Sequence, residues 1–399
     1  MCVPTLSFAE ARACVLERVK AHAGLPVETE VGLAEAAGRV LARAVRADRD
    51  YPALARSVRD GFAVRAADVP AALRVAGEVR AGEFYAGEVG PGEAVEIMTG
   101  APIPRGADAV VMVEHVTREG GQVHIDRAAK AGQFVNPQGS EARRGQLLLS
   151  PGQRLDFSHV ALLATVGITR VPVYAPAPVA ILATGDEIVE PDQTPEDFQI
   201  RNSNVYSLSA QVARAGGCPR ILPVARDEFG DTRSKIELGL EAGLLLLSGG
   251  VSAGKYDLVE TVLADLGAEF YFDRVLIQPG QPLVFGRVRD KFFFGLPGNP
   301  AATMVTFEIF ARAAVEILAG QTETALPLMR AKLTRDFRHK MGLTRFLPAR
   351  LSEDGAELTP VPWQGSGDVP ALARANAFLV ADADREEWKA GEWMRVLLK

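Results

Sequence analysis

The chain has 399 residues and a formal net charge of −6, with 48% hydrophobic and 24% charged residues, which is an ordinary balance for a globular protein. This length exceeds what one hydrophobic core supports and predicts roughly two to four domains. The negative charge argues against a broad nucleic-acid-binding surface. The sequence shows neither a leader-like apolar core near its start nor a run of about 18 apolar residues for a membrane span.

Cysteine and histidine residues are few and scattered. The three cysteines, Cys2, Cys14 and Cys218, have neither the spacing of a metal site nor that of a disulfide framework. A reducing cytoplasm is therefore the expected location. The five histidines show no HExxH or i, i+4 pairing, so a zinc hydrolase is not expected.

Two helices are predicted near the start of the chain. Residues 7–23 have a helical pattern in which Ser7, as N-cap, and Glu10, three residues later, make a capping box. Residues 31–41 predict a second, shorter helix.

Three regions with different sequence patterns follow along the chain. From 45 to 135, short apolar stretches alternate with Gly/Pro turns, which predicts a β-rich domain. From 178 to 318, strands alternate with helices, which predicts a doubly wound α/β domain. After 320, short strands and turns predict a small β-barrel or sandwich.

The most informative stretch is the four-leucine run 244–247, which reads as a strand buried on both faces. Ser248-Gly249-Gly250 follows it, and a helical pattern resumes at 258. A strand, a glycine turn and a helix start together favour an anion site. Asp257 stands beside that helix start, and a carboxylate next to a phosphate site indicates a bridging Mg²⁺.

Polar loops also follow other strands of the predicted α/β sheet. In such sheets ligands bind at the carboxyl ends of the strands. Taken singly, each loop is more simply a turn with a capping side chain. Taken together, they favour a site at which the carboxylates Glu187, Asp227 and Asp257 converge. These loops are 183–187, 226–228, 248–250 and 297–300.

The β-rich region carries two further signals. Asp60-Gly61 precedes an apolar strand, and residues 97–104 form a strand followed by a proline-stiffened loop. Each is also explained by a plain turn. No GxSxG elbow is found, so acyl-transfer catalysis has no support.

These motifs together resemble the MoeA family of molybdopterin molybdenumtransferases, which includes the C-terminal domain of gephyrin. The resemblance extends almost from end to end of the chain. The matching segments are 57–64, 97–114, 181–188, 202–203, 248–257, 278–286, 295–302 and 364–376.

The resemblance implies a fold of the class α/β plus β, multidomain and elongated. It also implies a homodimer with composite active sites, in which the insertion domain of one subunit faces the α/β domain of the other. The implied domains are an N-terminal helical and strand linker domain (1–45 and 142–177), a β-rich insertion domain (46–141), a doubly wound α/β molybdopterin-binding domain (178–322) and a C-terminal β-barrel domain (323–399).

The implied activity is that of a molybdopterin molybdotransferase in molybdenum cofactor biosynthesis. Such an enzyme inserts molybdate into adenylylated molybdopterin, with Mg²⁺-dependent hydrolysis of the adenylate and release of AMP and cofactor. Its implied partners are the small pterin substrate and other molybdenum-cofactor biosynthesis proteins, with no nucleic acid and no membrane. A non-catalytic molybdopterin-binding carrier or scaffold, or a tungstate-inserting enzyme, remains an alternative.

Site residues follow by matching motifs. Glu141 takes the place of the family's usual Asp. The implied catalytic residues are Asp60, Thr99, Glu187, Asp227 and Asp257, of which the last three also hold the metal. The implied pterin- and phosphate-binding residues are Ser248, Gly249, Gly250, Gln278, Gln281, Pro297, Gly298, Asn299, Pro300 and Ser366.

The sequence also departs from the family pattern at anion-binding positions. Gln278 and Gln281 stand where the family commonly has lysines, and Lys255 or Arg274 would be the cations nearby. The segment around Leu343 lacks an arginine that often follows the glycine. These differences weaken or rearrange anion binding, and they keep the carrier hypothesis open.

Overall fold

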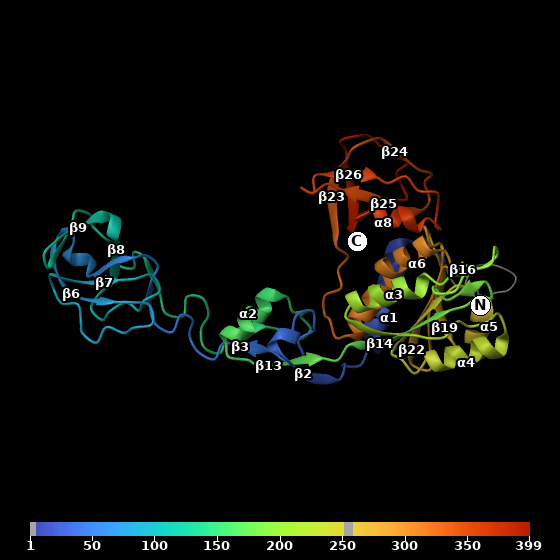
Figure 1. The fold of residues 1–399 in the computed structure, drawn as a ribbon, viewed down its shortest axis with the longest axis horizontal. Coiled ribbons are helices and arrows are strands. Elements are labelled where there is room, and N and C mark those ends of the chain that lie inside the picture. Colours follow the sequence, from blue (N-terminus) through green and yellow to red (C-terminus); the bar gives the residue numbers. More distant parts are fainter. Residues whose placement is uncertain (1–4, 251–257) are drawn as a thin grey trace. The chain divides into compact units, whose positions relative to one another are not determined.

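The computed structural model describes residues 5–250 and 258–399 (Figure 1). The described chain divides into two compact units. One joins the chain through Ala42 with Gly152–Asp156 and Arg170–Lys399, and the other joins Arg43–Pro151 with Phe157–Thr169. Within the described ranges, no helix is long and apolar enough to cross a membrane.

The first unit is built on a large mixed sheet. Every neighbouring pair in it is parallel except those made by β21, which runs antiparallel to both of its neighbours. In spatial order, the seven strands found among the described residues are β1 (Thr5–Leu6), β19 (Glu269–Val275), β21 (Pro282–Val288), β22 (Lys291–Leu296), β18 (Leu244–Ser248), β14 (Ala177–Ala183) and β17 (Gly217–Ile221).

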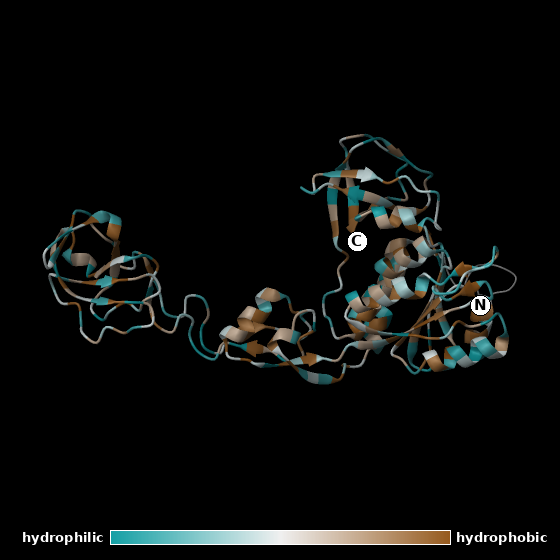
Figure 2. Cartoon of the chain, viewed as in Figure 1, coloured by the Kyte–Doolittle hydropathy of each residue, from teal (hydrophilic) through white to brown (hydrophobic). Residues whose placement is uncertain are grey.

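Helices cover both faces of this sheet, and the alternation of side chains along β14 explains why. Val179 and Ile181 pack with one helical layer, and Ala180 and Leu182 with the other. The doubly wound prediction is confirmed, and Figure 2 shows the apolar strands between the helices. One layer holds α1 (Phe8–His22), α3 (Asn204–Arg214), α6 (Pro300–Thr306), the π-helical turn Phe307–Ala311 and α7 (Arg312–Leu318); the other holds α4 (Phe229–Gly239) and α5 (Leu258–Asp265).

A closed β-barrel follows at the C-terminal end, which decides between the predicted barrel and sandwich. The short strand β20 (Ile277–Gln278) pairs in parallel with the barrel strand β25, so the chain that leaves β19 contacts the barrel directly. Within the described chain, the barrel ring is β25 (Thr344–Leu351), β26 (Glu357–Pro360), β23 (Leu328–Leu333), β29 (Trp393–Leu398) and β27 (Ala377–Ala381), accompanied by β24 (Phe337–Arg338), β28 (Glu387–Trp388) and α8 (Val369–Arg374).

The second unit is β-rich, as predicted. Its main sheet has the order β8 (Ala109–Met112), β5 (Gly61–Val64), β7 (Glu93–Ile97), β6 (Ala71–Val79), β10 (Gln122–Ile125) and β9 (Val116–Glu119). Smaller elements are β3 (Val45–Arg46) paired with β12 (Leu147–Leu149), β4 (Arg56–Ser57) paired with β11 (Val135–Asn136), and the helix α2 (Phe157–Thr165).

The predicted helix over 31–41 is wrong. Residues Glu28–Gly32 form β2, which pairs antiparallel with β13 (Arg170–Tyr174), and only Leu33–Glu35 makes a 3₁₀ turn. Val31 lies opposite Val171, so its apolar side chain is used by a distant strand. Long-range pairing has overridden the local pattern.

The remaining short strand pair joins β15 (Ile188–Val189) and β16 (Ile200–Arg201).

Candidate active site

Three of the predicted loops begin side by side at one edge of the large sheet. β14, β18 and β22 are parallel neighbours, with Ala183 opposite Ser248 and Ser248 opposite Leu296. The Thr184 N–H donates to the Ser248 carbonyl at 3.1 Å, and the Gly249 N–H donates to the Leu296 carbonyl at 3.3 Å. The loops that follow the three strands therefore meet where ligands bind in open α/β sheets.

The Gly249-Gly250 turn requires glycine at both positions. Their φ angles are +95° and +66°, in the left-handed region. A Cβ at Gly249 would lie 2.8 Å from the Thr184 carbonyl oxygen, and one at Gly250 would lie 2.8 Å from Thr184 Oγ1. The backbone of the turn is thus packed directly against the first residue of the neighbouring loop.

Asn204, the first residue of α3, ties two of these loops together. Its Nδ2 donates to Ser248 Oγ at 2.8 Å and to the Gly298 carbonyl at 2.8 Å. Sequence reasoning assigned no role to this residue. The sequence feature that could have pointed to Asn204 is its position at the start of the helix that follows the first strand-end loop.

Several buried polar atoms at this edge have no hydrogen-bond partner among the described residues. They are Thr184 Oγ1, Asn202 Nδ2 and Asn204 Oδ1. Thr184 is 5% exposed and Asn202 is 4% exposed. Leaving a buried polar group unpaired costs about 1–3 kcal/mol. We call Thr184, Asn202, Asn204, Ser248 and the Gly249-Gly250 turn the cradle, and its open donors and acceptors suit a polar ligand.

Two of the predicted carboxylates, Glu187 and Asp227, are exposed and belong to the loops that follow β14 and β17. The Glu187 carboxylate folds over Gly185, where a Cβ would overlap it. The Asp227 N–H donates to Asp186 Oδ1 at 3.4 Å, so the loops after β14 and β17 are also joined. The remaining predicted members of this site, Asp257 and Lys255, lie outside the described residues.

Across residues 5–250 and 258–399, no group of three His, Cys, Asp or Glu side chains could hold a metal ion. Mg²⁺ is usually bound by one or two carboxylates together with substrate phosphates and water. Glu187 and Asp227 carry the oxygen donors that this mode uses, and among the described residues neither belongs to a protein-only metal cage.

A cavity of about 310 Å³ brings together most of the other predicted binding residues. Gln278, Gln281, Pro297, Asn299 and Ser366 line it. Ser366 is held there because its carbonyl accepts a hydrogen bond of 2.9 Å from the N–H of Ala301, in the first turn of α6. The glutamine, proline and C-terminal segments, which are distant in the sequence, therefore meet at one cavity.

Asp60 and Thr99 meet in the second unit. Thr99 donates to Asp60 Oδ1 from its backbone N–H at 2.6 Å and from its hydroxyl at 2.8 Å. The N–H first and the hydroxyl second lower the pKa of the Asp60 carboxyl below its ordinary value. Both side chains are exposed. The pair presents a fixed, ionised carboxylate at the surface of this unit.

The Asp60-Gly61 dipeptide does not form a plain hairpin turn. Gly61 is the first residue of β5, and a Cβ there would overlap the Val111 carbonyl of β8. The neighbouring loop is fixed by hydrogen bonds from the Gly100 N–H to the Ser57 carbonyl at 2.8 Å and from the Ser57 N–H to the Ala101 carbonyl at 3.0 Å.

Glu141, the residue that takes the place of the family's usual Asp, lies in another loop of the second unit. It accepts a hydrogen bond of 3.0 Å from Asn136 Nδ2.

Nearly the whole chain is similar to known proteins. Residues 6–167 match the MoeA N-terminal region (domain I and II), residues 180–317 match a probable molybdopterin binding domain, and residues 330–399 match the MoeA C-terminal region (domain IV). A molybdopterin molybdenumtransferase of Bacillus subtilis (strain 168) is 36% identical over 387 residues, which cover 93% of this chain and 90% of the relative.

Solved structures similar to this chain are also of MoeA proteins. A crystal structure of a molybdopterin biosynthesis MoeA protein from Pyrococcus horikoshii has a TM-score of 0.76 and 32% identity, covering 99% of each chain. A crystal structure of a molybdopterin biosynthesis MoeA protein from Pyrococcus horikoshii OT3 has a TM-score of 0.82 and 28% identity, covering 99% of this chain and all of the other.

Proposed function

The chain belongs to the MoeA family of molybdopterin molybdenumtransferases, and we propose that it inserts molybdenum into molybdopterin during molybdenum cofactor biosynthesis. The substrates are adenylylated molybdopterin and molybdate. The observation that carries the proposal is the cradle, where three strand-end loops meet around buried polar atoms that have no hydrogen-bond partner among the described residues.

The cradle is proposed to hold the phosphate end of the pterin. Backbone N–H groups in a glycine turn favour anions. Ser248 Oγ is positioned by Asn204, and Thr184 Oγ1 remains free to donate. These neutral donors orient the substrate without a charge of their own, so the negative charge of its phosphates must be balanced elsewhere.

Glu187 and Asp227 would hold Mg²⁺, with Asp257 as a further proposed ligand outside the described residues. When bound, Mg²⁺ neutralises charge on the phosphate oxygens at which the adenylate is cleaved. Water breaks the bond between the two phosphates, AMP leaves, and the dithiolene sulfurs retain the molybdenum.

Asp60 is proposed to orient the attacking water. Its lowered pKa keeps it ionised at neutral pH, and Thr99 fixes it by two hydrogen bonds. A homodimer with composite sites, in which the partner subunit contributes Asp60 and Thr99, is proposed from the family resemblance. Contact with other cofactor-biosynthesis proteins is proposed on the same basis.

Two alternatives stay open. The uncharged Gln278 and Gln281 favour a carrier that binds molybdopterin without inserting molybdenum. Tungstate is so similar to molybdate that the residues give no basis for discrimination.

The test is AMP release from adenylylated molybdopterin with molybdate and Mg²⁺. We expect AMP release that requires molybdate and stops when the metal is chelated. Tight pterin binding without molybdate-dependent turnover would favour the carrier, and competition with tungstate in the same assay would settle oxyanion preference. Wild-type turnover in both Asp60→Ala and Asp257→Ala would overturn the site assignment.

A further inference from the structure

A different cavity, of about 270 Å³, lies wholly within the first unit, at the opposite end of β14 from the cradle. Gly217, which lines it, is the first residue of β17 and pairs with Ala177, the first residue of β14. The cradle begins after Ala183, at the other end of β14, which is roughly 20 Å away at the usual rise per residue. The two sites are therefore separate.

Two arginines line this cavity, and backbone carbonyls hold both of them in place. Arg39 Nη2 donates to the Tyr174 carbonyl at 3.2 Å. Arg154 donates from Nε to the Gly38 carbonyl at 3.2 Å and from Nη2 to the Arg214 carbonyl at 2.7 Å. Because carbonyl oxygens carry no net charge, these hydrogen bonds fix the guanidinium groups without neutralising them.

Neither guanidinium is paired with a carboxylate in the described part of the chain. None of the ion pairs found there includes Arg39 or Arg154, and no described Asp or Glu lines the cavity. The Arg214 carbonyl ends α3, and a helix C-terminus contributes a partial charge of only about −0.5. Nε and Nη1 of Arg39 and Nη1 of Arg154 have no hydrogen-bond partner among the described residues, and they are not buried. These N–H groups are therefore accessible to a ligand.

The helical layer beside the cavity does not supply the missing negative charge. Glu316 of α7, which is 6% exposed, is a buried carboxylate on which the charge of Arg154 acts. Burial raises the pKa of Glu316, whereas the charges of Arg312, Arg154 and Arg12 act to lower it. The pKa of Arg12 is itself lowered to about 10, first by burial and then by the charge of Arg312. Glu316 is therefore shared among several cations and leaves Arg154 with positive charge to spare.

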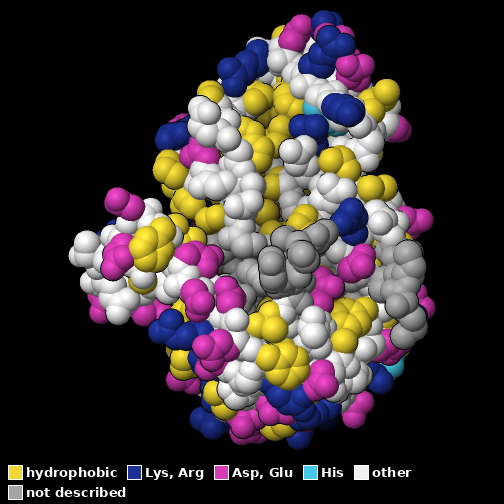
Figure 3. All heavy atoms as spheres, turned by 90° about the vertical axis from the view of Figure 1, so that its right-hand side faces the viewer, with side chains coloured by type: hydrophobic (Ala, Val, Ile, Leu, Met, Phe, Trp, Pro, Cys, Tyr) yellow, Lys and Arg dark blue, Asp and Glu magenta, His cyan; other side chains and the backbone are white. Residues whose placement is uncertain are grey.

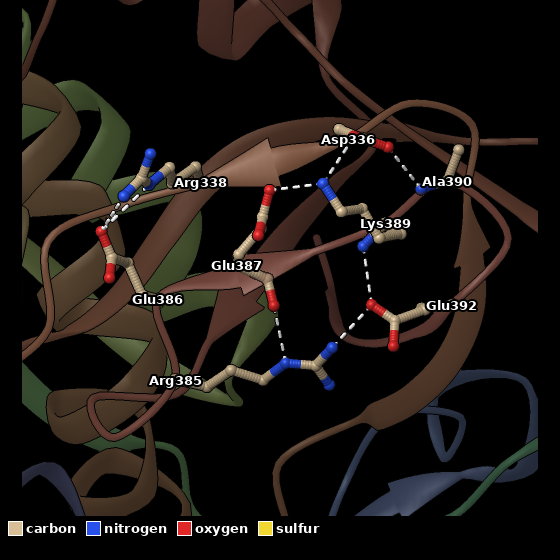
Figure 4. Close-up of polar contacts among 8 residues, drawn as sticks. All are labelled: Asp336, Arg338, Arg385, Glu386, Glu387, Lys389, Ala390 and Glu392. Atoms are coloured by element: carbon tan, nitrogen blue, oxygen red, sulfur yellow. Dashed lines mark hydrogen bonds and ion pairs between the residues drawn. The ribbon is translucent and has the colours of Figure 1, made fainter.

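Cations of the C-terminal barrel show the contrasting, paired arrangement. Arg338 contacts Glu386 at 2.7 Å, and Arg385 contacts Glu392 at 2.6 Å (Figure 4). In the space-filling view, Lys and Arg side chains lie among Asp and Glu side chains over the barrel (Figure 3). Those cations belong to a mixed-charge surface, whereas the two arginines of the cavity have no carboxylate of their own among the described residues.

We propose that this cavity binds a small organic anion, whose carboxylate or phosphate group contacts Arg39 and Arg154. A guanidinium presents N–H donors in a planar fork that matches two oxygens of such a group. The rest of the described lining is the Tyr174 side chain with alanine, valine, proline and glycine residues, which suits a compact apolar body. The proposal is independent of the proposed function, because the cavity and the cradle lie at opposite ends of β14.

The experiment titrates the full-length protein with phenyl phosphate and, in a parallel arm, with benzoate, using isothermal titration calorimetry. The two probes have the same apolar ring, so a difference between them identifies the preferred anionic group. Benzyl alcohol, which has the ring without a charge, is the neutral probe and is expected not to bind. Arg154→Gln is expected to weaken binding of the preferred anion by about 10- to 100-fold, the effect of losing one charged hydrogen-bonding partner.

Two further variants separate binding in the cavity from structural and general charge effects. Ala213→Phe fills the cavity from an exposed position in the last turn of α3 while keeping both arginines, and it is expected to abolish binding. Arg350→Gln removes the same charge from an exposed position on β25 and is expected to leave binding unchanged. Thermal unfolding of each variant verifies the fold.

Several results would overturn the proposal. They are no measurable binding of either anion to the wild type, equal binding of benzyl alcohol, binding that survives Ala213→Phe or Arg154→Gln, and an equal loss in Arg350→Gln. These outcomes are separable from failure of the proposed function, since anion binding is measured without molybdopterin. Arg154-dependent binding in a protein that releases no AMP would leave this site standing and remove the insertion activity.

Discussion

The cradle and the Asp60–Thr99 pair differ in burial and in how far their hydrogen bonds are satisfied. In the cradle, neutral polar atoms such as Thr184 Oγ1 are buried and have no partner among the described residues. In the other unit, the Asp60 carboxylate is exposed and already accepts two hydrogen bonds from Thr99. A ligand that pairs the buried atoms of the cradle removes the cost of leaving them unpaired, and this favours binding. The Asp60–Thr99 pair instead holds a charge in a fixed position before any ligand binds. Binding and charge positioning are therefore assigned to different units.

The largest expected effect comes from removing the exposed Asp60 carboxylate. Asp60→Ala is expected to lower the rate of AMP release by about 10²–10⁴-fold, the usual contribution of a positioned acid–base or water-orienting group. Thermal stability should be nearly unchanged, because the side chain is exposed. Steady-state kinetics and a melting curve measure both. A loss of stability that matches the loss of rate would show that Asp60 is structural.

The next effect concerns the cradle backbone. Gly250→Ala is expected to lower the free energy of unfolding by about 1–3 kcal/mol, because it adds a Cβ at a left-handed φ and against Thr184 and Val259. Gly216→Ala is the matched control: its φ is +88°, and its Cβ would meet nothing within 4 Å. Urea unfolding measures the two variants. Equal losses would show that packing against Thr184 contributes nothing.

A smaller effect is expected from removing the Thr184 hydroxyl, which has no hydrogen-bond partner among the described residues. Thr184→Val is expected to leave the free energy of unfolding unchanged or raised by up to about 1 kcal/mol, while weakening pterin binding about 5-fold. Thr232→Val is the control, since the Thr232 hydroxyl donates to the Arg226 carbonyl at 2.9 Å and its loss should destabilise the fold. Destabilisation by Thr184→Val without a change in binding would contradict the role of the cradle.

The smallest effect is a shift in pH dependence. The pKa of Asp60 is lowered in the folded protein, so its ionised form and the activity that needs it persist above that pKa and are lost only as the pH falls through it. Thr99→Val removes the hydroxyl donor but keeps the N–H, so the pKa rises part of the way. The acid limb of the pH–rate profile should move to higher pH. A profile identical to that of the wild type would remove Asp60 from the rate-determining chemistry.

Local patterns predicted much of the fold. Ser7 caps α1 and Glu10 completes the capping box, because both partners lie within one turn. The four-leucine strand is fully buried and central, as its composition indicated. The helix predicted over 31–41 failed because β2 is formed by pairing with β13, which lies far along the chain.

The candidate site was predictable only in part, for a related reason. Parallel strands end at one edge, so Ser248 and its neighbouring loops could be grouped from the order of elements. The role of Asn204 could not, because Ser248 is distant from it in the sequence and meets it only when α3 packs beside the large sheet. The catalytic roles of Asp60, Glu187 and Asp227 stay predictions.

The central claim is most directly tested by measuring AMP and pterin-bound molybdenum in the same reaction. Purified protein, adenylylated molybdopterin, Mg²⁺ and limiting molybdate should yield AMP and pterin-bound molybdenum in equal amounts, and neither product should form when molybdate is left out. AMP release that is independent of molybdate, or stable pterin binding that yields neither product, would contradict molybdenum insertion by this chain.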